Sequence, residues 1–318
     1  MAQQTTSFGY LLPTREIVMS QPVPDCSQVI ELAERAEALG FDSVWVGDSI
    51  LARPRLEPLT TLASVATRTR RVKLGTAVLL SALRHPVVLA NELANLDLLS
   101  QGRLILGLGI AANNPLVQNE FRACGVDFSH RIGIFEEGVT IMRRLWTEPE
   151  VTFDGHYFKL DGVRAGLRPQ QQKGIPIWLA GSVDNSFRRV LELGDGWFPL
   201  PFSPEVFARH WQQLAALGKE MGRDTDHLAR AVYMTVNVND DVSQAEKEVR
   251  AFMEGYYGVP YEKMAAIQPA CAGPAAKCIE WVQGFIEQGA ETICVRFGSP
   301  DQKGQLERFA SSVLPKLV

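Results

Sequence analysis

Small and polar residues follow two of the short apolar runs in this sequence, at places where a bound molecule could lie. Gly181-Ser182 follows the run IPIWLA and precedes a helical pattern, so its N–H groups, its hydroxyl and the positive helix end favour a phosphate. An ordinary serine cap is the alternative. Gly107, Gly109 and Asn113 end the run RLILGLGI, where small residues admit a flat ring and the Asn113 amide can hydrogen-bond it. A tight turn in which an asparagine caps the following helix explains these residues equally well.

Titratable and charged residues follow two further runs. His85 carries an imidazole, the side chain most often used for proton transfer, and is a candidate catalytic or substrate-binding residue, although a structural role beside the helix that Pro86 begins is the simpler explanation. Arg296, in ICVRFGSP, is expected to hold an anionic substrate or cofactor tail, or else to pair with a carboxylate. No His-x-His pair or carboxylate cluster indicates a metal site.

Eight short apolar runs must position these residues. They are apolar on both faces, which is typical of parallel strands covered by helices. The runs are 8–12, 42–48, 72–80, 103–110, 175–181, 195–200, 229–238 and 292–297. Helical periodicity follows each run, and the predicted helices include 57–68, 86–99, 130–146, 185–193, 204–221 and 243–257.

Eight strand–helix units predict a (β/α)8 barrel, an α/β fold in one domain over residues 1–318. The alternative, a doubly wound sheet, requires a glycine fingerprint after its first strand, and GYLLPTRE has none. Two stretches interrupt the repeat. Residues 147–174, after the fourth strand, contain VTFDGHYFKL and predict an inserted hairpin. Residues 257–273, between the last two strands, are rich in Gly and Pro and predict an irregular lid.

The composition limits the partners and the compartment. A net charge of −4 over 318 residues gives no basic surface for nucleic acid. No apolar run approaches the ~20 residues of a membrane span, and no signal peptide is recognised. The five cysteines are scattered, without a CxxC pair, and are expected to be reduced thiols of a cytoplasmic protein.

Several of these segments together resemble a known family. The segments are FDSVWVGDS, the long run from EPLTTLASVATRTRR to GRLILGLGIA, IWLAGS with LGDGWFP, and the closing ERFASSVLP. In this order they resemble the bacterial-luciferase-like oxidoreductases, which include two-component FMN monooxygenases and enzymes of the deazaflavin coenzyme F420. The resemblance implies an insertion after the fourth strand, a cofactor at the C-terminal ends of the strands, and a homodimer.

The resemblance also assigns expected roles to individual residues. Gly75-Thr76-Ala77 matches a strand bulge, often with a non-prolyl cis peptide, that supports the middle of the flavin ring. Gly181-Ser182, with Val183 beside it, matches the seat of the cofactor phosphate. Asp48-Ser49 matches an Asp-His pair of many deazaflavin enzymes, in which the histidine exchanges a proton. Serine has a pKa far from neutral and is a poor substitute for that histidine, so proton transfer at Ser49 is in doubt.

The function favoured by the sequence is a monooxygenase of a small organic substrate that receives reduced FMN from a flavin reductase. Such an enzyme requires few acid–base residues, because the cofactor does the chemistry and the protein excludes water. The alternative is an F420-dependent reductase or dehydrogenase, and a third hypothesis is a non-catalytic subunit. The substrate itself is not readable. All three hypotheses assume that the ends of strands two to five, with Thr76, Asn113 and Ser182, surround one hollow.

Overall fold

Eight parallel strands close into a barrel, with helices outside them, and form the (β/α)8 fold that the sequence predicts. The computed structural model describes residues 6–20, 23–201, 203–268 and 270–317. The barrel strands follow one another in chain order, and β8 pairs with both β7 and β9. They are β1 (Ser7–Leu11), β2 (Ser43–Val46), β3 (Lys73–Leu79), β4 (Leu104–Leu108), β7 (Ile177–Leu179), β8 (Gly196–Trp197), β9 (Ala229–Val238) and β11 (Thr292–Phe297).

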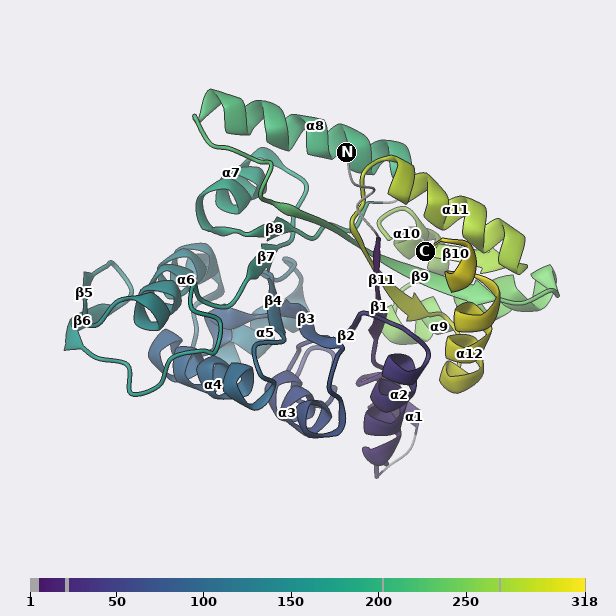
Figure 1. Ribbon diagram of the computed structural model, residues 1–318, viewed down its shortest axis with the longest axis horizontal. Helices are drawn as coiled ribbons and strands as arrows, with labels where there is room; N and C mark the ends of the chain where they lie inside the picture. The colour runs from purple at the N-terminus through teal and green to yellow at the C-terminus, as the bar shows by residue number, and fades with distance from the viewer. Residues whose placement is uncertain (1–5, 21–22, 202, 269, 318) are drawn as a thin grey trace.

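The helices surround this barrel (Figure 1). The long ones are α2 (Ser27–Ala38), α3 (Pro58–Arg68), α4 (Pro86–Leu99), α6 (Arg131–Thr147), α7 (Asp184–Leu193), α8 (Pro204–Glu220), α9 (Val242–Tyr257), α11 (Ala275–Glu287) and α12 (Gln302–Ser312). Their ends lie within a few residues of the predicted ones. Three further helices were not predicted: α1 (Glu16–Ser20), α5 (Pro115–Ala123) and α10 (Tyr261–Ala265). None of the helices in the described ranges is long and apolar enough to cross a membrane.

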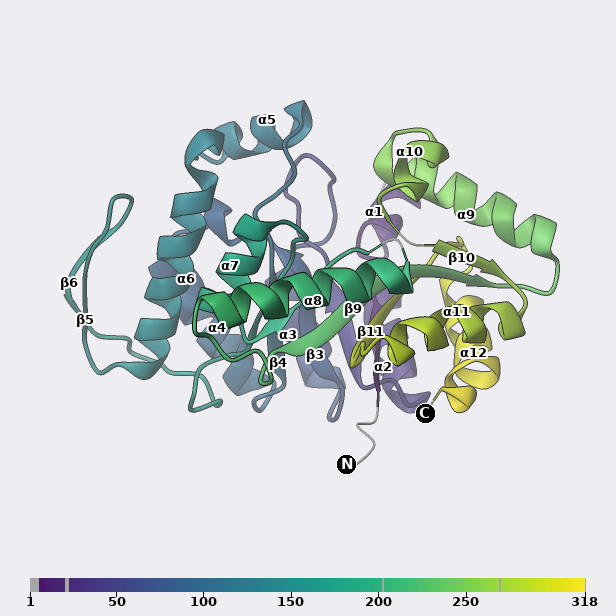
Figure 2. The same cartoon turned by 90° about the horizontal axis from the view of Figure 1, so that it is seen from above.

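Two insertions leave the barrel where the sequence predicts them. After β4 and α6, strands β5 (Val151–Asp154) and β6 (Lys159–Val163) form an antiparallel hairpin, which projects beside α6 (Figure 2). Between β9 and β11, the prediction of an irregular lid is wrong in part. This segment contains α10 and the strand β10 (Ala270–Gly273), which pairs in parallel with the last four residues of β9. Gly273 has a φ of +142°, a conformation that favours glycine, and it ends the strand.

The barrel has two apolar layers because each strand buries both of its faces. Residues that point outward pack beneath the helices in one large cluster. Residues that point inward form a smaller cluster that includes Trp45, Trp178 and Phe198. The Trp45 ring lies 5.4 Å from the Trp178 ring and 5.2 Å from the Phe198 ring, so aromatic side chains fill the barrel interior.

Gly75 on β3 makes room for one of these rings. A Cβ atom at this position would lie 2.0 Å from Cε3 of Trp45, which is fully buried and cannot retreat. Gly75→Ala is therefore expected to lower the free energy of unfolding by about 1–3 kcal/mol or more, as is typical of an overpacked core. Urea unfolding measures the change. Gly255→Ala on α9 is the matched control, since its Cβ would meet nothing within 4 Å. This control is expected to be neutral or stabilising, and equal losses in both variants would contradict the packing explanation.

Candidate active site at the barrel mouth

A cavity of about 220 Å³ opens among the C-terminal ends of the barrel strands. Its walls come from the ends of β2, β3, β4, β7, β8 and β9 together with α5 and α9. One part of the wall is lined by the short side chains of four alanines: Ala77, Ala111, Ala112 and Ala180. At Ala77 the pairing of β3 with β4 shifts register, and the Ala77–Val78 peptide bond is cis, as the resemblance predicts.

A larger hollow of about 1120 Å³ lies between α1, α2, α9 and α12. Its walls are mostly helix surfaces and include exposed charged residues. We place the candidate active site in the smaller cavity, because active sites of (β/α)8 barrels lie at the strand ends and because buried polar groups converge there. The described residues contain no cluster of three or more His, Cys, Asp or Glu side chains that could hold a metal ion.

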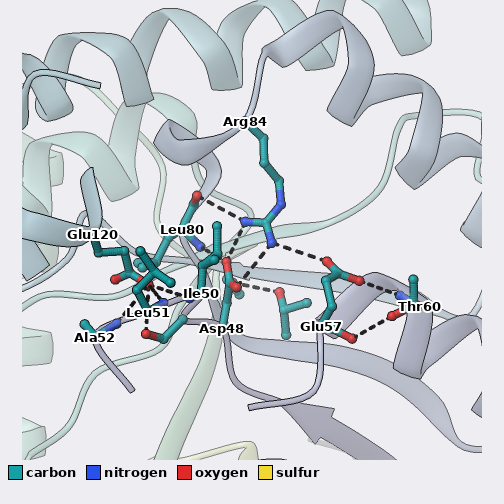
Figure 3. A network of polar contacts seen from close by, with 12 residues as sticks. Asp48, Ile50, Leu51, Ala52, Glu57, Thr60, Leu80, Arg84 and Glu120 are labelled. Carbon is teal, nitrogen blue, oxygen red and sulfur yellow. Dashed lines mark hydrogen bonds and ion pairs between the residues drawn. The ribbon is translucent and has the colours of Figure 1, made fainter. Parts of the chain in front are cut away.

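A buried ion pair fixes the ends of β2 and β3 against each other (Figure 3). Asp48 Oδ2 accepts from Arg84 Nη1 at 2.6 Å and from the Leu80 backbone N–H at 3.0 Å. The Asp48 side chain is only 1% exposed, so it depends on these donors. Burial disfavours the charged form of Arg84, but hydrogen bonding and attraction from Asp48 outweigh it and raise the pKa of Arg84. The Asp48 carboxylate therefore has a structural role in this ion pair, and it also lines the cavity.

A second buried carboxylate, Glu120, projects from α5 onto the loop after β2 (Figure 3). Its Oε1 accepts the Ser49 hydroxyl at 2.9 Å and the Leu51 N–H at 2.8 Å, and it also accepts from the Ile50 N–H. Its other oxygen, Oε2, is buried and has no hydrogen-bond partner among the described residues. Glu120 also lines the cavity. A buried carboxylate oxygen that has no partner among the described residues has unused capacity to accept a proton or a hydrogen bond.

Arginines and tyrosines gather on the α9 side of the cavity. Arg296 on β11 points into the barrel, is fully buried, and donates to Thr235 Oγ1 at 2.8 Å and to Tyr257 Oη at 3.0 Å. Its guanidinium carbon lies 4.6 Å from the centre of the Tyr256 ring. Arg53 and Arg55 lie beside the same two tyrosines and line the cavity.

Comparison with known proteins places this geometry in a family. A sequence profile of the luciferase-like monooxygenase family matches residues 6–302. The chain belongs to this family. This luciferase-like chain thus has the barrel, the insertion after β4 and the cavity at the C-terminal ends of the strands that the sequence resemblance implies.

Individual relatives within the luciferase-like family differ in activity. The chain is 28% identical to an F420-dependent glucose-6-phosphate dehydrogenase of Intrasporangium calvum, over 91% of this chain and 94% of that protein. It is 29% identical to a 4-hydroxyprotoasukamycin monooxygenase of Streptomyces nodosus subsp. asukaensis, over 75% of this chain and 66% of that protein. Its fold superposes on the solved structure of an F420-dependent secondary alcohol dehydrogenase with a TM-score of 0.82 and 21% identity, covering 99% of both chains.

The structure brings only some of the predicted site residues of this luciferase-like chain to the cavity. Asp48, Ser49 and Ala77 line it. Gly75 instead faces Trp45 inside the barrel, and Thr76 is fully buried with its hydroxyl on the Gly107 carbonyl at 2.8 Å. His85 caps α4, accepting from the Val87 N–H, and its exposed ring contacts Phe158 of the hairpin. Neither His85 nor Arg296 is part of the cavity wall.

The loops after β4 and β7 reach the cavity through residues next to the predicted ones. Ala111 and Ala112 line it, whereas Asn113 is exposed and accepts from Gln118 at 2.8 Å. The Val78 side chain occupies the space beside Gly109, since a Cβ atom on Gly109 would lie 2.5 Å from Val78 Cγ2. Ala180 lines the cavity, whereas Gly181, Ser182 and Val183 follow it at the entrance to α7 and lie outside the wall. The shared hollow therefore exists, but Thr76, Asn113 and Ser182 do not line it.

Sequence reasoning missed the polar residues that the structure adds to the site: Arg53, Arg55, Arg84, Glu120, Tyr233, Tyr256 and Tyr257. A signal for Glu120 was present. Val117, Glu120 and Phe121 share the buried face of α5, so an acidic residue interrupts an apolar stripe. An asparagine helix cap is among the alternatives that the sequence leaves open here, but no helix over Pro115–Ala123 is predicted from it, although Asn114 as cap and Pro115 at the first position are a helix-start signal.

Proposed function

We propose that this protein is an F420-dependent oxidoreductase that moves a hydride between the deazaflavin and a small organic substrate. The observation that carries the proposal is the extent of the likeness to the F420-dependent dehydrogenase, which spans 91% of this chain and 94% of that relative. The likeness to the monooxygenase spans 66% of that protein. The sequence alone favoured FMN with a separate flavin reductase, and the comparisons favour the alternative.

The cavity fits the head of a deazaflavin. Its volume of about 220 Å³ is below the roughly 300–1,000 Å³ of sites that enclose a whole drug-sized ligand, so a ring system fits while a tail lies outside. The alanines at 77, 111, 112 and 180 leave room for a flat ring to approach the backbone. Gly181, Ser182 and Val183, outside the wall beside Ala180, remain the proposed seat of the cofactor phosphate. When bound, the deazaflavin would supply or accept the hydride.

The protein contributes proton handling and positioning. The buried Oε2 of Glu120, which has no hydrogen-bond partner among the residues that the structure describes, is the group proposed to exchange the substrate proton, a role that Ser49 cannot take by itself. The Ser49 hydroxyl donates to Glu120 Oε1 and thereby fixes the carboxylate. The Asp48–Arg84 pair holds the ends of β2 and β3, the strands that carry this wall. Phe198 and Val78 are apolar and exclude water from the same cavity.

A second candidate function is an FMN-dependent monooxygenase. It is favoured by Ser49, which stands where many deazaflavin relatives carry a histidine, and by the likeness to the monooxygenase. A homodimer also remains an expectation from the family resemblance.

Titration of the purified protein with each cofactor tests the proposal. We expect quenching of coenzyme F420 fluorescence at a dissociation constant at least about tenfold below that for FMN, a difference of about 1.4 kcal/mol. A matched titration with Glu92→Gln, an exposed residue of α4, controls for general charge effects. Tighter binding of FMN than of F420 would overturn the proposal in favour of the monooxygenase.

A further inference from the structure

We propose that the α9 side of the cavity binds an anionic group of the substrate, a phosphate or a carboxylate, through Arg53 and Arg55. The inference rests on the proposed function in one respect: it treats the cavity as the place where the substrate reacts. The anion site itself is argued from the side chains that surround it.

Both guanidinium groups are held at the cavity by aromatic rings. The guanidinium carbon of Arg53 lies 5.3 Å from the centre of the Tyr257 ring, and that of Arg55 lies 5.7 Å from the centre of the Tyr256 ring. Arg55 Nη1 also donates to Tyr256 Oη at 3.1 Å. Arg53 and Arg55 are partly exposed and line the cavity with these two tyrosines. Their positions are fixed before any ligand binds, which lowers the cost of binding.

The end of β2 is shaped to receive Arg55. A Cβ atom on Gly47 would lie 2.1 Å from Nη1 of Arg55, so any side chain at position 47 would displace the guanidinium. Because Gly47 has no side chain, the Arg55 guanidinium lies against the backbone at the end of β2. Arg55 lines the cavity together with Asp48 and Ser49. The arginine is therefore built into the site, although it stays partly exposed to solvent.

The arginines of this cluster form no ion pair with a carboxylate among the described residues, although the buried Glu16 attracts Arg15, Arg55 and Arg296 from a greater distance. Among the described residues, no carboxylate oxygen lies within 4.0 Å of the side-chain nitrogens of Arg15, Arg53, Arg55 or Arg296. Arg84, in contrast, is paired with Asp48. Partial burial and repulsion from Arg55 and Arg53 lower the pKa of Arg15, as crowding of like charges requires. A mouth with this charge attracts an anion.

The chemistry of the cluster selects phosphate or carboxylate. Guanidinium groups match the oxygen pairs of both anions, and the resulting charge-assisted hydrogen bonds are stronger than neutral ones. The position also suits a substrate, because the Arg53 backbone N–H donates to Ser49 Oγ at 2.8 Å and Ser49 donates to Glu120. An anion held at Arg53 and Arg55 therefore places the rest of its molecule beside the proposed proton-exchanging carboxylate.

Calorimetric titration of the cofactor-free protein with inorganic phosphate at low ionic strength tests the site. We expect saturable binding that is weakened at least about tenfold in the double variant Arg53→Gln/Arg55→Gln, since two charge-assisted hydrogen bonds are lost. The matched control is Arg122→Gln, an exposed arginine of α5 outside the cavity wall, and its affinity is expected to be unchanged. Thermal unfolding followed by circular dichroism verifies that all variants are folded. Absence of binding to the unmodified protein, or equal loss in both variants, would overturn the proposal.

A second arm separates the substrate from the anionic tail of the cofactor. Coenzyme F420 is titrated by fluorescence into the unmodified protein and into the double variant, both without phosphate. We expect the two dissociation constants to differ by less than about twofold, because the proposed anion belongs to the substrate. Loss of F420 affinity in the double variant would assign the arginines to the cofactor and overturn the substrate assignment. Phosphate binding without any F420 binding would leave the anion site standing and reject the proposed function.

Discussion

Replacing Arg84 by methionine is expected to lower the free energy of unfolding by about 3–5 kcal/mol, the typical effect of removing one partner from a buried ion pair. The Asp48 side chain is 1% exposed, and Arg84 supplies both of its charged hydrogen bonds, at 2.6 and 3.2 Å. Without the guanidinium, Asp48 keeps the Leu80 N–H and no cation among the described residues. Urea unfolding followed by tryptophan fluorescence measures the change.

Two further variants make this result specific. Arg68→Met removes an arginine that is paired with Glu34 on the surface and 61% exposed, and it is expected to cost less than about 1 kcal/mol. Asp48→Asn combined with Arg84→Met removes both charges and is expected to recover part of the loss. If Arg84→Met costs no more than Arg68→Met, the ion pair does not fix the strand ends as we describe.

Replacing Glu120 by glutamine is expected to reduce turnover by about 10²–10⁴-fold, the usual contribution of a positioned proton-transfer group. The amide oxygen can still accept from Ser49 and from the N–H groups of Ile50 and Leu51, so the loop is expected to stay in place. The amide cannot take a proton at the position of Oε2. Single-turnover oxidation or reduction of bound coenzyme F420, followed by absorbance, measures the rate.

The control for this prediction is Glu92→Gln, which changes the same charge on an exposed part of α4 and is expected to leave the rate unchanged. The unfolding midpoint and the F420 dissociation constant of Glu120→Gln are expected to match the unmodified protein. Full turnover in Glu120→Gln would show that the proton is exchanged elsewhere. A lowered rate with lowered F420 affinity would instead indicate that Glu120 supports the cofactor.

The barrel was predictable because its signals are local. Each strand is a run buried on two faces, as in Val44-Trp45-Val46, and glycines such as Gly40, with a φ of +91°, end the helices. The same local logic failed for β10, because the run ACAG is short and becomes a strand only by pairing with the end of β9. It failed for α5 because this nine-residue helix is inserted between β4 and α6, where the (β/α)8 repeat leads one to expect a single helix.

The candidate site was predicted less well than the fold. Ser49 follows β2 and Ala77 lies within β3, so both belong to local strand motifs, whereas Glu120 reaches Ser49 from 71 residues away. Arg55 meets Tyr256 across 201 residues. Such contacts depend on the closure of the whole barrel, which no spacing within one segment records. Glycines misled the prediction for a related reason, since Gly75 and Gly109 serve neighbouring protein side chains, Trp45 and Val78.

The length of β9 has a mechanical consequence for the segment that follows it. The first part of this ten-residue strand closes the ring against β8, and its last four residues extend beyond and bond to β10. The chain that leaves α9 beside Tyr256 and Tyr257 is thus tethered again within about a dozen residues, at Ala270. One end of this segment is anchored in a helix and the other is paired into the sheet. The two tyrosines of the cavity wall therefore stand at the start of a segment held at both ends, which restricts how far they can be displaced.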